Sequence, residues 1–235
     1  MGAPGLPDGI EACLFDLDGV LTQTAKVHAR AWKQTFDEFL KSRPGQKPFD
    51  IDRDYAEYVD GKPREDGVRS FLQSRGIALD PAVVHDIASR KDAAFLALIH
   101  AHGVERYPGS VHYLDAVRRA GIRTAVVSSS KNTTEVLKAA GLTGFDAQVD
   151  GNVAESEHLH GKPAPDTFLE AARMLHLDAA RCAVFEDALA GVEAGRAGNF
   201  GRVVGVDRAN QKDALYRHGA DVVVEDLEEL LGRTA

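Results

Sequence analysis

Short apolar segments alternate with amphipathic segments along most of the chain. Runs rich in apolar and β-branched residues predict strands at 12–17, 123–130, 181–187, 202–207 and 220–226. Between these runs, apolar side chains recur at helical spacing, as at Val111, Leu114 and Val117 and at Phe168, Leu169, Ala172 and Leu175. Because the strands are apolar almost throughout, the pattern predicts an α/β fold in which helices cover both faces of a doubly wound parallel sheet.

The segment between the first and second predicted strands is far longer than a single crossover needs. Its apolar residues follow a helical period, for example at Trp32, Phe36 and Phe39. A second helical run, 84–99, skips one apolar turn at Lys91. We therefore expect a core domain made of 1–24 and 107–235, with a small helical cap domain, 25–106, inserted after the first strand.

Charge and cysteine content narrow the class of protein. The 235 residues carry a formal net charge of −8, which disfavours nucleic acid and anionic membranes as partners. Segment 25–106 is relatively basic, which suits an anionic substrate and is equally typical of a solvated surface. Cys13 and Cys182 have no disulfide-framework or CxxC spacing, and no apolar run approaches the ~20 residues that span a bilayer. We expect a cytoplasmic monomer.

Polar side chains gather where the predicted strands end. They are Asp16 and Asp18 after the first strand, Ser128, Ser129 and Ser130 after the second, Lys162 before a helix, and Glu186 with Asp187 after a later strand. Ligands of open α/β sheets bind outside the carboxyl ends of the strands, so we expect these groups to share one site. Alternate residues of a strand point to the same face, which allows Asp16 and Asp18 to converge.

Up to four carboxylates at one site repel one another unless a cation lies among them. Their hard oxygen atoms suit Mg²⁺, one ion per site, which completes its coordination with water and substrate phosphate. Ser128 and Lys162 supply a hydroxyl and a positive charge for a phosphoryl group, and Gly19 allows close approach of the main chain. The set predicts phosphoryl transfer in which one aspartate attacks phosphorus and the other exchanges a proton with the leaving or entering hydroxyl.

The segments DLDGVLTQT, VVSSSKN, GKPAPD and FEDALAG, in this order, resemble the four motifs of the haloacid dehalogenase superfamily. The resemblance covers nearly the whole chain, including a helical cap after the first motif. It implies that Asp16 is the nucleophile and Asp18 the general acid/base, with Ser128 and Lys162 as phosphate ligands. The implied magnesium ligands are Asp16, the main-chain carbonyl of Asp18, Glu186 and Asp187, although Glu186 could instead support the other ligands.

Within the superfamily, the chain resembles the β-phosphoglucomutase-like subfamily. TAKVHARAW is similar to its cap entry, which implies a hinge at Thr24 and places His28 and Trp32 where that subfamily has a histidine and a tryptophan near the general acid/base. GKPRED resembles the cap loop whose arginine, here Arg64, holds the distal phosphate. A capping role for His28 and a surface ion pair for Arg64 stay open. SSSKN implies further phosphate contacts at Ser129, Ser130, Lys131 and Asn132.

Four positions depart from the subfamily pattern. Asp60 replaces a lysine that faces the sugar, Gln23 replaces an acidic residue, and Ala188 and Leu189 replace polar residues. The resemblance implies a mutase that converts β-D-glucose 1-phosphate to D-glucose 6-phosphate, primed by the sugar 1,6-bisphosphate. The departures leave open a sugar-phosphate phosphatase with the same machinery. A binding protein without catalysis is the third hypothesis.

Overall fold

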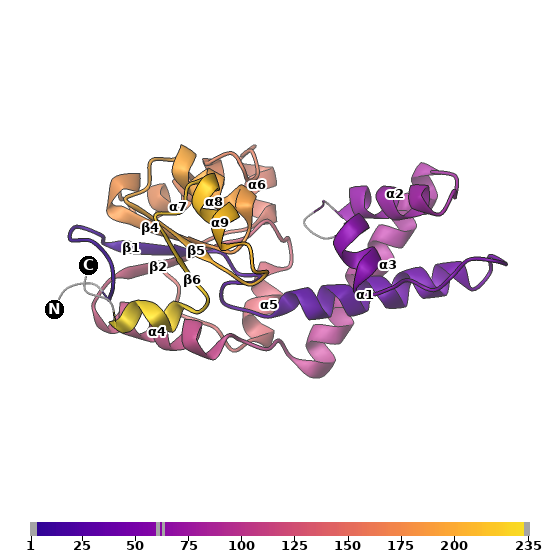
Figure 1. The fold of residues 1–235 in the computed structure, drawn as a ribbon, viewed down its shortest axis with the longest axis horizontal. Helices are drawn as coiled ribbons and strands as arrows, with labels where there is room; N and C mark the ends of the chain where they lie inside the picture. The colour runs from indigo at the N-terminus through magenta and orange to yellow at the C-terminus, as the bar shows by residue number, and fades with distance from the viewer. Residues whose placement is uncertain (1–3, 60–61, 63, 233–235) are drawn as a thin grey trace. The chain divides into compact units, whose positions relative to one another are not determined.

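The chain folds into two compact units (Figure 1). The computed structural model describes residues 4–59, 62 and 64–232, with Ala56 described by its main chain alone. Met1–Gln23 and Val104–Ala235 form one unit, which we call the sheet unit. Thr24–Gly103 form the second, the helical unit, which is inserted between the first two strands of the sheet. No helix of the described ranges is both long and apolar enough to cross a membrane.

Within the described residues, the sheet unit contains one sheet of six parallel strands in the order β3-β2-β1-β4-β5-β6. The strands are β1 (Ala12–Phe15), β2 (Arg123–Val127), β3 (Ala147–Val149), β4 (Cys182–Glu186), β5 (Arg202–Val206) and β6 (Val222–Val224). The chain extends the sheet to one side from β1 and to the other from β4, so its direction reverses between these two strands. In doubly wound sheets, ligands bind at such a reversal, outside the carboxyl ends of the strands.

Helices cover both faces of this sheet (Figure 1). α7 (Asp166–Met174), α8 (Leu189–Ala197) and α9 (Lys212–His218) lie over one face, and α4 (Pro108–Arg119) lies over the other. The unit also contains α5 (Thr133–Ala139), α6 (Gly151–Ser156), and the 3₁₀ helices η2 (Ala179–Arg181) and η3 (Leu227–Gly232). The predicted fold class, a doubly wound parallel sheet with an inserted helical segment, is confirmed.

Strand β1 illustrates why the strands are apolar throughout. Leu14 belongs to the core cluster that includes Phe168 of α7. The next residue, Phe15, belongs to the other face, where its ring stacks on Phe185 at a centroid distance of 4.6 Å and meets Tyr113 of α4 edge-on at 6.4 Å. Because both faces are covered, a polar side chain in the middle of β1 would be buried whichever way it pointed.

Some sequence predictions differ from the structure in their details. Residues 128–130 form a loop after β2 rather than extending the strand. The edge strand β3 has three residues, with Gln148 in the middle, and is too short to give a recognisable pattern. The prediction that Leu169 lies on the buried face of its helix is wrong, since it is 39% exposed. Residues three and four apart share a helix face, so Ala171 takes the inner position beside Phe168.

The helical unit is built around an aromatic core. Its elements are α1 (Thr24–Leu40), the π-helix η1 (Tyr55–Val59), α2 (Arg64–Ser74) and α3 (Pro81–His102). The ring of Phe36 lies at the centre of the core, with ring centroids at 5.0 Å from Trp32, 5.2 Å from Phe49 and 4.0 Å from Phe71. The core therefore joins α1, α2 and the loop between them.

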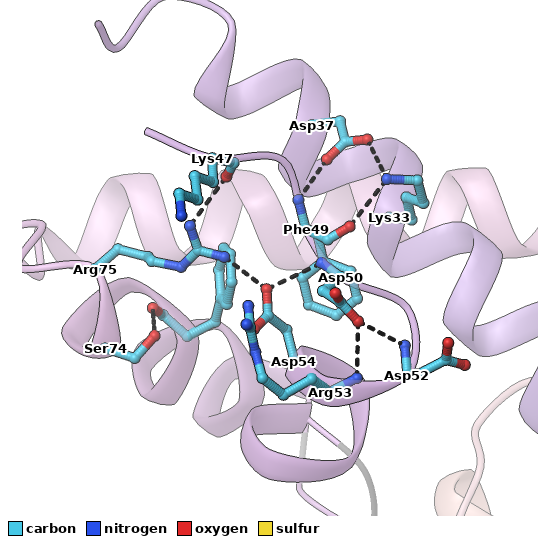
Figure 2. Close-up of polar contacts among 11 residues, drawn as sticks. Lys33, Asp37, Lys47, Phe49, Asp50, Asp52, Arg53, Asp54, Ser74 and Arg75 are labelled. Atoms are coloured by element: carbon cyan, nitrogen blue, oxygen red, sulfur yellow. Dashed lines mark hydrogen bonds and ion pairs between the residues drawn. The ribbon is translucent and has the colours of Figure 1, made fainter. Parts of the chain in front are cut away.

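Asp54 lies at the centre of a buried polar network in the helical unit (Figure 2). Its carboxylate is 1% exposed and accepts hydrogen bonds from Arg75 at 2.5 Å, from Arg53 at 2.9 Å and from the Asp50 N–H at 2.9 Å. Burial opposes the charge, but the three donors outweigh it and hold the pKa of Asp54 below its usual range. Arg75 also donates to the Lys47 carbonyl at 2.9 Å, so the network ties the loop before η1 to the end of α2.

Replacing Asp54 by alanine is expected to destabilise the helical unit by about 3 kcal/mol, because Arg75 would keep a mostly buried guanidinium without its partner. This stability is present above the unfolded aspartate pKa of about 3.9 and is lost as the pH falls through the lower pKa of the folded state. Urea unfolding at pH 7, followed by the fluorescence of Trp32, measures the loss.

The exposed neighbour Asp52 provides the matched control. Asp52→Ala removes the same carboxylate from the same loop and is expected to change the free energy of unfolding by less than about 0.5 kcal/mol. An equal loss in the two variants would contradict the assigned role of Asp54.

Candidate functional site

A sharp turn after β1 places the two predicted catalytic aspartates. Asp16 is 8% exposed, and its N–H donates to the Phe185 carbonyl of β4 at 2.9 Å. Three residues further on, the Gly19 N–H donates to the Thr22 carbonyl at 2.8 Å and closes the turn. The half-buried Asp18 lies within this turn. Both aspartates therefore lie at the carboxyl end of β1, beside the point where the strand order reverses.

Asp187 packs against the same turn. Gly19 has a φ of +88°, and a Cβ built on it would lie 1.9 Å from Oδ2 of Asp187. The backbone conformation and the close approach of the carboxylate both require glycine here. Gly191 has a similar relation to Glu186, since its Cβ would lie 1.9 Å from Oε1 of that side chain. The two glycines let the acidic side chains of the β4 loop lie close to the main chain.

Lys162 joins the acidic residues of β1 and β4. Its Nζ donates to Oδ1 of Asp16 at 2.5 Å, to Oε1 of Glu186 at 2.5 Å and to the Val127 carbonyl at 3.3 Å. The lysine side chain is 9% exposed. Burial disfavours the ammonium ion, but the two carboxylates outweigh this effect and raise the pKa of Lys162 above its usual range. The three acceptors lie at the carboxyl ends of the adjacent strands β2, β1 and β4, so Lys162 links these strand ends.

The ammonium ion of Lys162 balances only part of the negative charge at this edge. Burial raises the pKa of Asp16 to about 8, an effect that Lys162 opposes and that Glu186 and Asp18 increase. Burial likewise raises the pKa of Asp187 well above its usual range, and the charges of Glu186 and Asp16 add to the shift. The site therefore holds more carboxylates than its own residues can keep ionised near neutral pH.

The protein without metal is expected to lose stability as the pH rises from about 4 to about 8. Folded Asp16 holds its proton up to a pKa of about 8, whereas an unfolded aspartate releases it near 3.9. The contribution of Asp16 to stability is thus complete below the pKa of the unfolded state and is lost as the pH rises through the pKa of the folded state. We expect the melting temperature in EDTA to fall by roughly 5 °C between pH 5 and pH 8. Asp16→Asn is expected to reduce this slope, and an unchanged slope in the variant would contradict the assignment.

The donor set at this edge fits a hard divalent cation. The part of the chain that the structure describes holds no group of three or more His, Cys, Asp or Glu side chains arranged around a metal position. A site built from two carboxylates, Asp16 and Asp187, and the main-chain carbonyl of Asp18 needs no third side chain. Its ligands are all oxygen, as Mg²⁺ prefers, and the raised pKa values of both carboxyls reflect negative charge that a cation would balance.

Glu186 was predicted as a direct metal ligand, and its contacts favour the alternative supporting role. The residue is 1% exposed. Oε1 accepts from Lys162, and Oε2 accepts from the Ala188 N–H at 2.8 Å. Both oxygens are thus engaged, and the carboxylate orients Lys162 and the start of the loop after β4.

The predicted phosphate-binding segment begins directly after β2. Ser128 is 3% exposed, and its Oγ accepts from the Ser130 N–H at 3.1 Å. Oγ of Ser130 in turn accepts from the Asn132 N–H at 3.1 Å. These side-chain turns shape the loop, and Ser128 adjoins Val127, whose carbonyl binds Lys162.

Two other residues of this segment are not buried. Ser129 and Lys131 are exposed. Nζ of Lys131 pairs with Oε2 of Glu155 on α6 at 2.8 Å. A phosphate role for Lys131 would therefore require that side chain to exchange partners.

In the helical unit, the half-buried His28 contacts a buried lysine that is absent from the residues predicted to be functional. Nζ of Lys91 lies 2.7 Å from Nδ1 of His28, and the imidazole stacks on Phe95 at a centroid distance of 4.2 Å. Burial, followed by the charges of Lys91 and Arg64, lowers the pKa of His28 well below its usual range. The ammonium group of Lys91 donates a hydrogen bond to Nδ1 of the neutral His28, so Nε2 of the imidazole carries the hydrogen and is available as a donor.

Lys91 is 5% exposed and lies 5.2 Å from the ring centroid of Trp32. The signal for it is present in the sequence, because this lysine occupies the turn that interrupts the apolar face of α3. A lysine at a core position of a helix requires a specific partner. His28 is one such partner, and the two residues are 63 positions apart.

The other predicted residues of the helical unit are Arg64, Thr24 and Asp60. Arg64 forms an ion pair with Asp92 at 2.6 Å, the alternative that the sequence left open. Thr24 is fully buried at the first position of α1. Asp60, together with Gly61 and Pro63 of the predicted cap loop, lies outside the described residues.

Comparison with known proteins identifies the family. A family model described as haloacid dehalogenase-like hydrolase matches residues 10–199. The chain belongs to this family. This confirms the predicted family and the prediction that the protein is an enzyme. As a haloacid dehalogenase-like hydrolase, it carries the four matching motifs on the loops that follow β1, β2 and β4 and before α7.

The relatives of this haloacid dehalogenase-like hydrolase include named enzymes of similar length. It is 53% identical to the β-phosphoglucomutase of Mycobacterium bovis, over 97% of this chain and 94% of that protein. It is 34% identical to the β-phosphoglucomutase of Bacillus subtilis, over 94% and 95% of the two chains. A crystal structure of mutant CbbY from Rhodobacter sphaeroides with xylulose 1,5-bisphosphate is 26% identical, with a TM-score of 0.75 and coverage of 94% and 96%.

The structure gives physical roles to three of the departures from the subfamily pattern. Gln23 donates from Nε2 to the Arg106 carbonyl at 3.3 Å, which an ionised acid could not do. Its main-chain N–H also bonds the Glu105 carbonyl at 2.8 Å. Ala188 contributes its main-chain N–H to Glu186, and the partly buried Leu189 packs on the sheet core. In this haloacid dehalogenase-like hydrolase, these positions therefore support the fold around the motifs.

Proposed function

We propose that the protein is a Mg²⁺-dependent phosphoryl transferase that converts β-D-glucose 1-phosphate to D-glucose 6-phosphate, the reaction of a β-phosphoglucomutase in carbohydrate metabolism. The observation that carries the choice of reaction is the 53% identity to a β-phosphoglucomutase over nearly the full length of both chains. The contact of Lys162 with both Asp16 and Glu186 supports the chemistry.

In the proposed transfer, a carboxylate oxygen of Asp16 attacks phosphorus and the bond from phosphorus to the sugar oxygen breaks. Asp18 gives its proton to the departing oxygen, so that an aspartyl phosphate and a neutral hydroxyl remain. In the reverse direction, Asp18 takes the proton of the attacking hydroxyl and the phosphoryl group leaves Asp16. Two such transfers, to the 6-hydroxyl and from the 1-phosphate, convert one glucose phosphate into the other through the 1,6-bisphosphate.

The remaining groups of the sheet edge would bind the phosphoryl group and the cation. Lys162 and Ser128 would hold its oxygens, together with the main-chain N–H groups after Asp16. Asp16, Asp187 and the Asp18 carbonyl would hold Mg²⁺. When bound, the ion supplies positive charge that shields the attacking carboxylate from the phosphate it must approach.

The helical unit is proposed to be the cap domain. An aspartyl phosphate reacts with water unless water is excluded, so a mutase needs a second domain for this purpose. The neutral His28 with its Lys91 partner, and Arg64 with Asp92, are the polar groups that we assign to sugar-phosphate recognition. Thr24, the first residue of α1, is assigned to the hinge.

A sugar-phosphate phosphatase is the second candidate. The apolar Ala188 and Leu189, and Asp60 in place of a lysine, depart from the pattern of the mutases. A phosphatase would use the same attack by Asp16 and differ only in the acceptor, because water would take the phosphoryl group in place of the sugar hydroxyl.

One assay separates the two candidates. The enzyme is mixed with β-glucose 1-phosphate, Mg²⁺ and a trace of β-glucose 1,6-bisphosphate, and glucose 6-phosphate and inorganic phosphate are followed together. We expect glucose 6-phosphate to form with little phosphate release, and EDTA to stop the reaction. Phosphate release as fast as isomer formation would favour the phosphatase. No product beyond a control without enzyme would contradict the proposed mutase.

A further inference from the structure

The loop after β5, residues 207–211, lies at the same edge of the sheet as the proposed active site but carries none of the motif residues. It is held in one conformation by Asp207. Oδ1 of Asp207 accepts from the Gln211 N–H at 2.8 Å and from the Ala209 N–H at 3.2 Å, while the Asp207 N–H donates to the Val224 carbonyl at 2.8 Å. These hydrogen bonds restrain the loop, which follows the strand next to β4.

Arg208 reaches from this loop to the turn after β1. Its Nε donates to the Gly19 carbonyl at 2.9 Å, and one terminal nitrogen donates to the Glu225 carbonyl at 2.7 Å. Its guanidinium carbon lies 3.5 Å from the ring centroid of Tyr107, and the side chain is 17% exposed. The guanidinium is thus bound on its edge and covered on its face, which fixes the position of the Gly19 carbonyl.

Gln211, from the same loop, binds the turn that carries Asp187. Its Nε2 donates to the main-chain carbonyl of Asp187 at 2.9 Å. Arg208 and Gln211 therefore bind the main chains of two turns whose carboxylates repel each other. Both contacts are made to neutral carbonyl groups, while the charge of Arg208 pairs with the Asp226 carboxylate, outside the two turns, at 3.7 Å.

The turn that contains Gly19 and the turn that contains Asp187 are in close contact. The Cα of Gly19 lies so close to the Asp187 carboxylate that a methyl group could not be inserted between them. A small movement of either turn would change the separation of Asp187 from Asp16. Errors of about 1 Å in such a site cost on the order of 10²-fold in rate.

We propose that Arg208 and Gln211 are positioning residues that set the distance between the Asp16–Gly19 turn and the Asp187 turn, and with it the geometry of the cation site. This inference rests on the proposed function for its rate measurements. Its predictions for metal binding are independent of the proposed function, because Mg²⁺ affinity can be measured without substrate.

The test compares Arg208→Met, Arg208→Lys and Gln211→Met with the wild type. For each protein, kcat, KM for β-glucose 1-phosphate, the melting temperature and the affinity for Mg²⁺ by calorimetry are measured. We expect Arg208→Met to lower kcat by about 10- to 100-fold and to weaken Mg²⁺ binding by about 10-fold, with little change in KM. Arg208→Lys is expected to recover part of this loss, since one ammonium can bind the Gly19 carbonyl but cannot bridge it to Glu225.

Arg196→Met is the matched control. Arg196 also donates to a main-chain carbonyl, that of Gly219 at 3.2 Å, and pairs with a carboxylate, Asp221 at 2.8 Å, but it lies on α8, away from the site. We expect it to lower the melting temperature without changing kcat or Mg²⁺ affinity. Gln211→Met removes a single hydrogen bond and keeps the test decisive if Arg208→Met does not fold.

Melting temperatures that fall while kcat and Mg²⁺ affinity stay at wild-type values in the Arg208 and Gln211 variants would overturn the inference and leave a structural role only. If the wild type forms no glucose 6-phosphate, the proposed function fails, and the Mg²⁺ titrations still decide the positioning role. A wild type that does not bind Mg²⁺ would overturn both.

Discussion

Replacing Asp16 by asparagine is expected to reduce phosphoryl transfer by at least about 10⁴-fold while the fold stays intact. The amide has nearly the shape of the carboxylate, but its oxygen is a poor nucleophile and cannot form a stable bond to phosphorus. The carbonyl oxygen of the amide can still accept from Nζ of Lys162. Because burial and the neighbouring acids oppose the ionised form of Asp16, replacing it by a neutral amide is expected to cause no loss of stability.

Formation of the phosphoenzyme measures this effect directly. Wild type and variant are mixed with phosphate-labelled β-glucose 1,6-bisphosphate and Mg²⁺, quenched in acid and assayed for protein-bound label. The exposed Asp115 on α4 gives a control substitution of the same kind, Asp115→Asn, which is expected to keep full activity. Labelled Asp16→Asn protein would show that another residue is the nucleophile.

Replacing Lys162 by methionine is expected to have the second largest effect, on both activity and stability. Methionine keeps most of the side-chain length but removes the charge that Asp16 and Glu186 share at 2.5 Å. The loss of one partner from a buried ion pair costs about 3–5 kcal/mol. The loss of a positive donor beside the transferred group is expected to lower kcat by about 10²- to 10³-fold.

A second substitution separates the two consequences. In Lys162→Met with Glu186→Gln, one of the uncompensated charges is gone, so we expect part of the stability to return while activity stays low. Lys138→Met, at an exposed lysine paired with Glu135, is the control and is expected to leave both quantities unchanged. Recovery of activity in the double variant would mean that Lys162 only balances the charge of Glu186.

The sheet-edge part of the candidate site could be predicted because its information is local. Asp16 and Asp18 each follow an apolar strand by one or a few residues, and parallel strands bring their carboxyl ends to one edge. The same logic found Glu186 and Asp187. It could not decide which oxygen of Glu186 faces which partner, because that depends on where Lys162 and the Ala188 N–H lie in space.

Within each unit, other contacts join positions that are distant in the sequence. Arg208 and Gly19 are separated by 189 positions, and Lys91 and His28 by 63. Neither arginine nor lysine is informative by itself, since both are common on protein surfaces. The interrupted apolar face at Lys91 hinted at a buried charge, but only the packing of α1 against α3 identifies its partner.

The sequence by itself determined the order of elements, the inserted helical segment, and the acidic and basic groups at the strand ends, because hydrophobic period and strand polarity are properties of short segments. Only the tertiary structure showed that β3 forms one edge of the sheet. It also determined the Asp54 network, the partner of His28 and the contact of Arg208 with Gly19. These features depend on which faces meet and how closely, and burial then decides which charges need partners. A carboxylate in the sequence becomes a titrating group with a pKa of about 8 only when the fold removes its water.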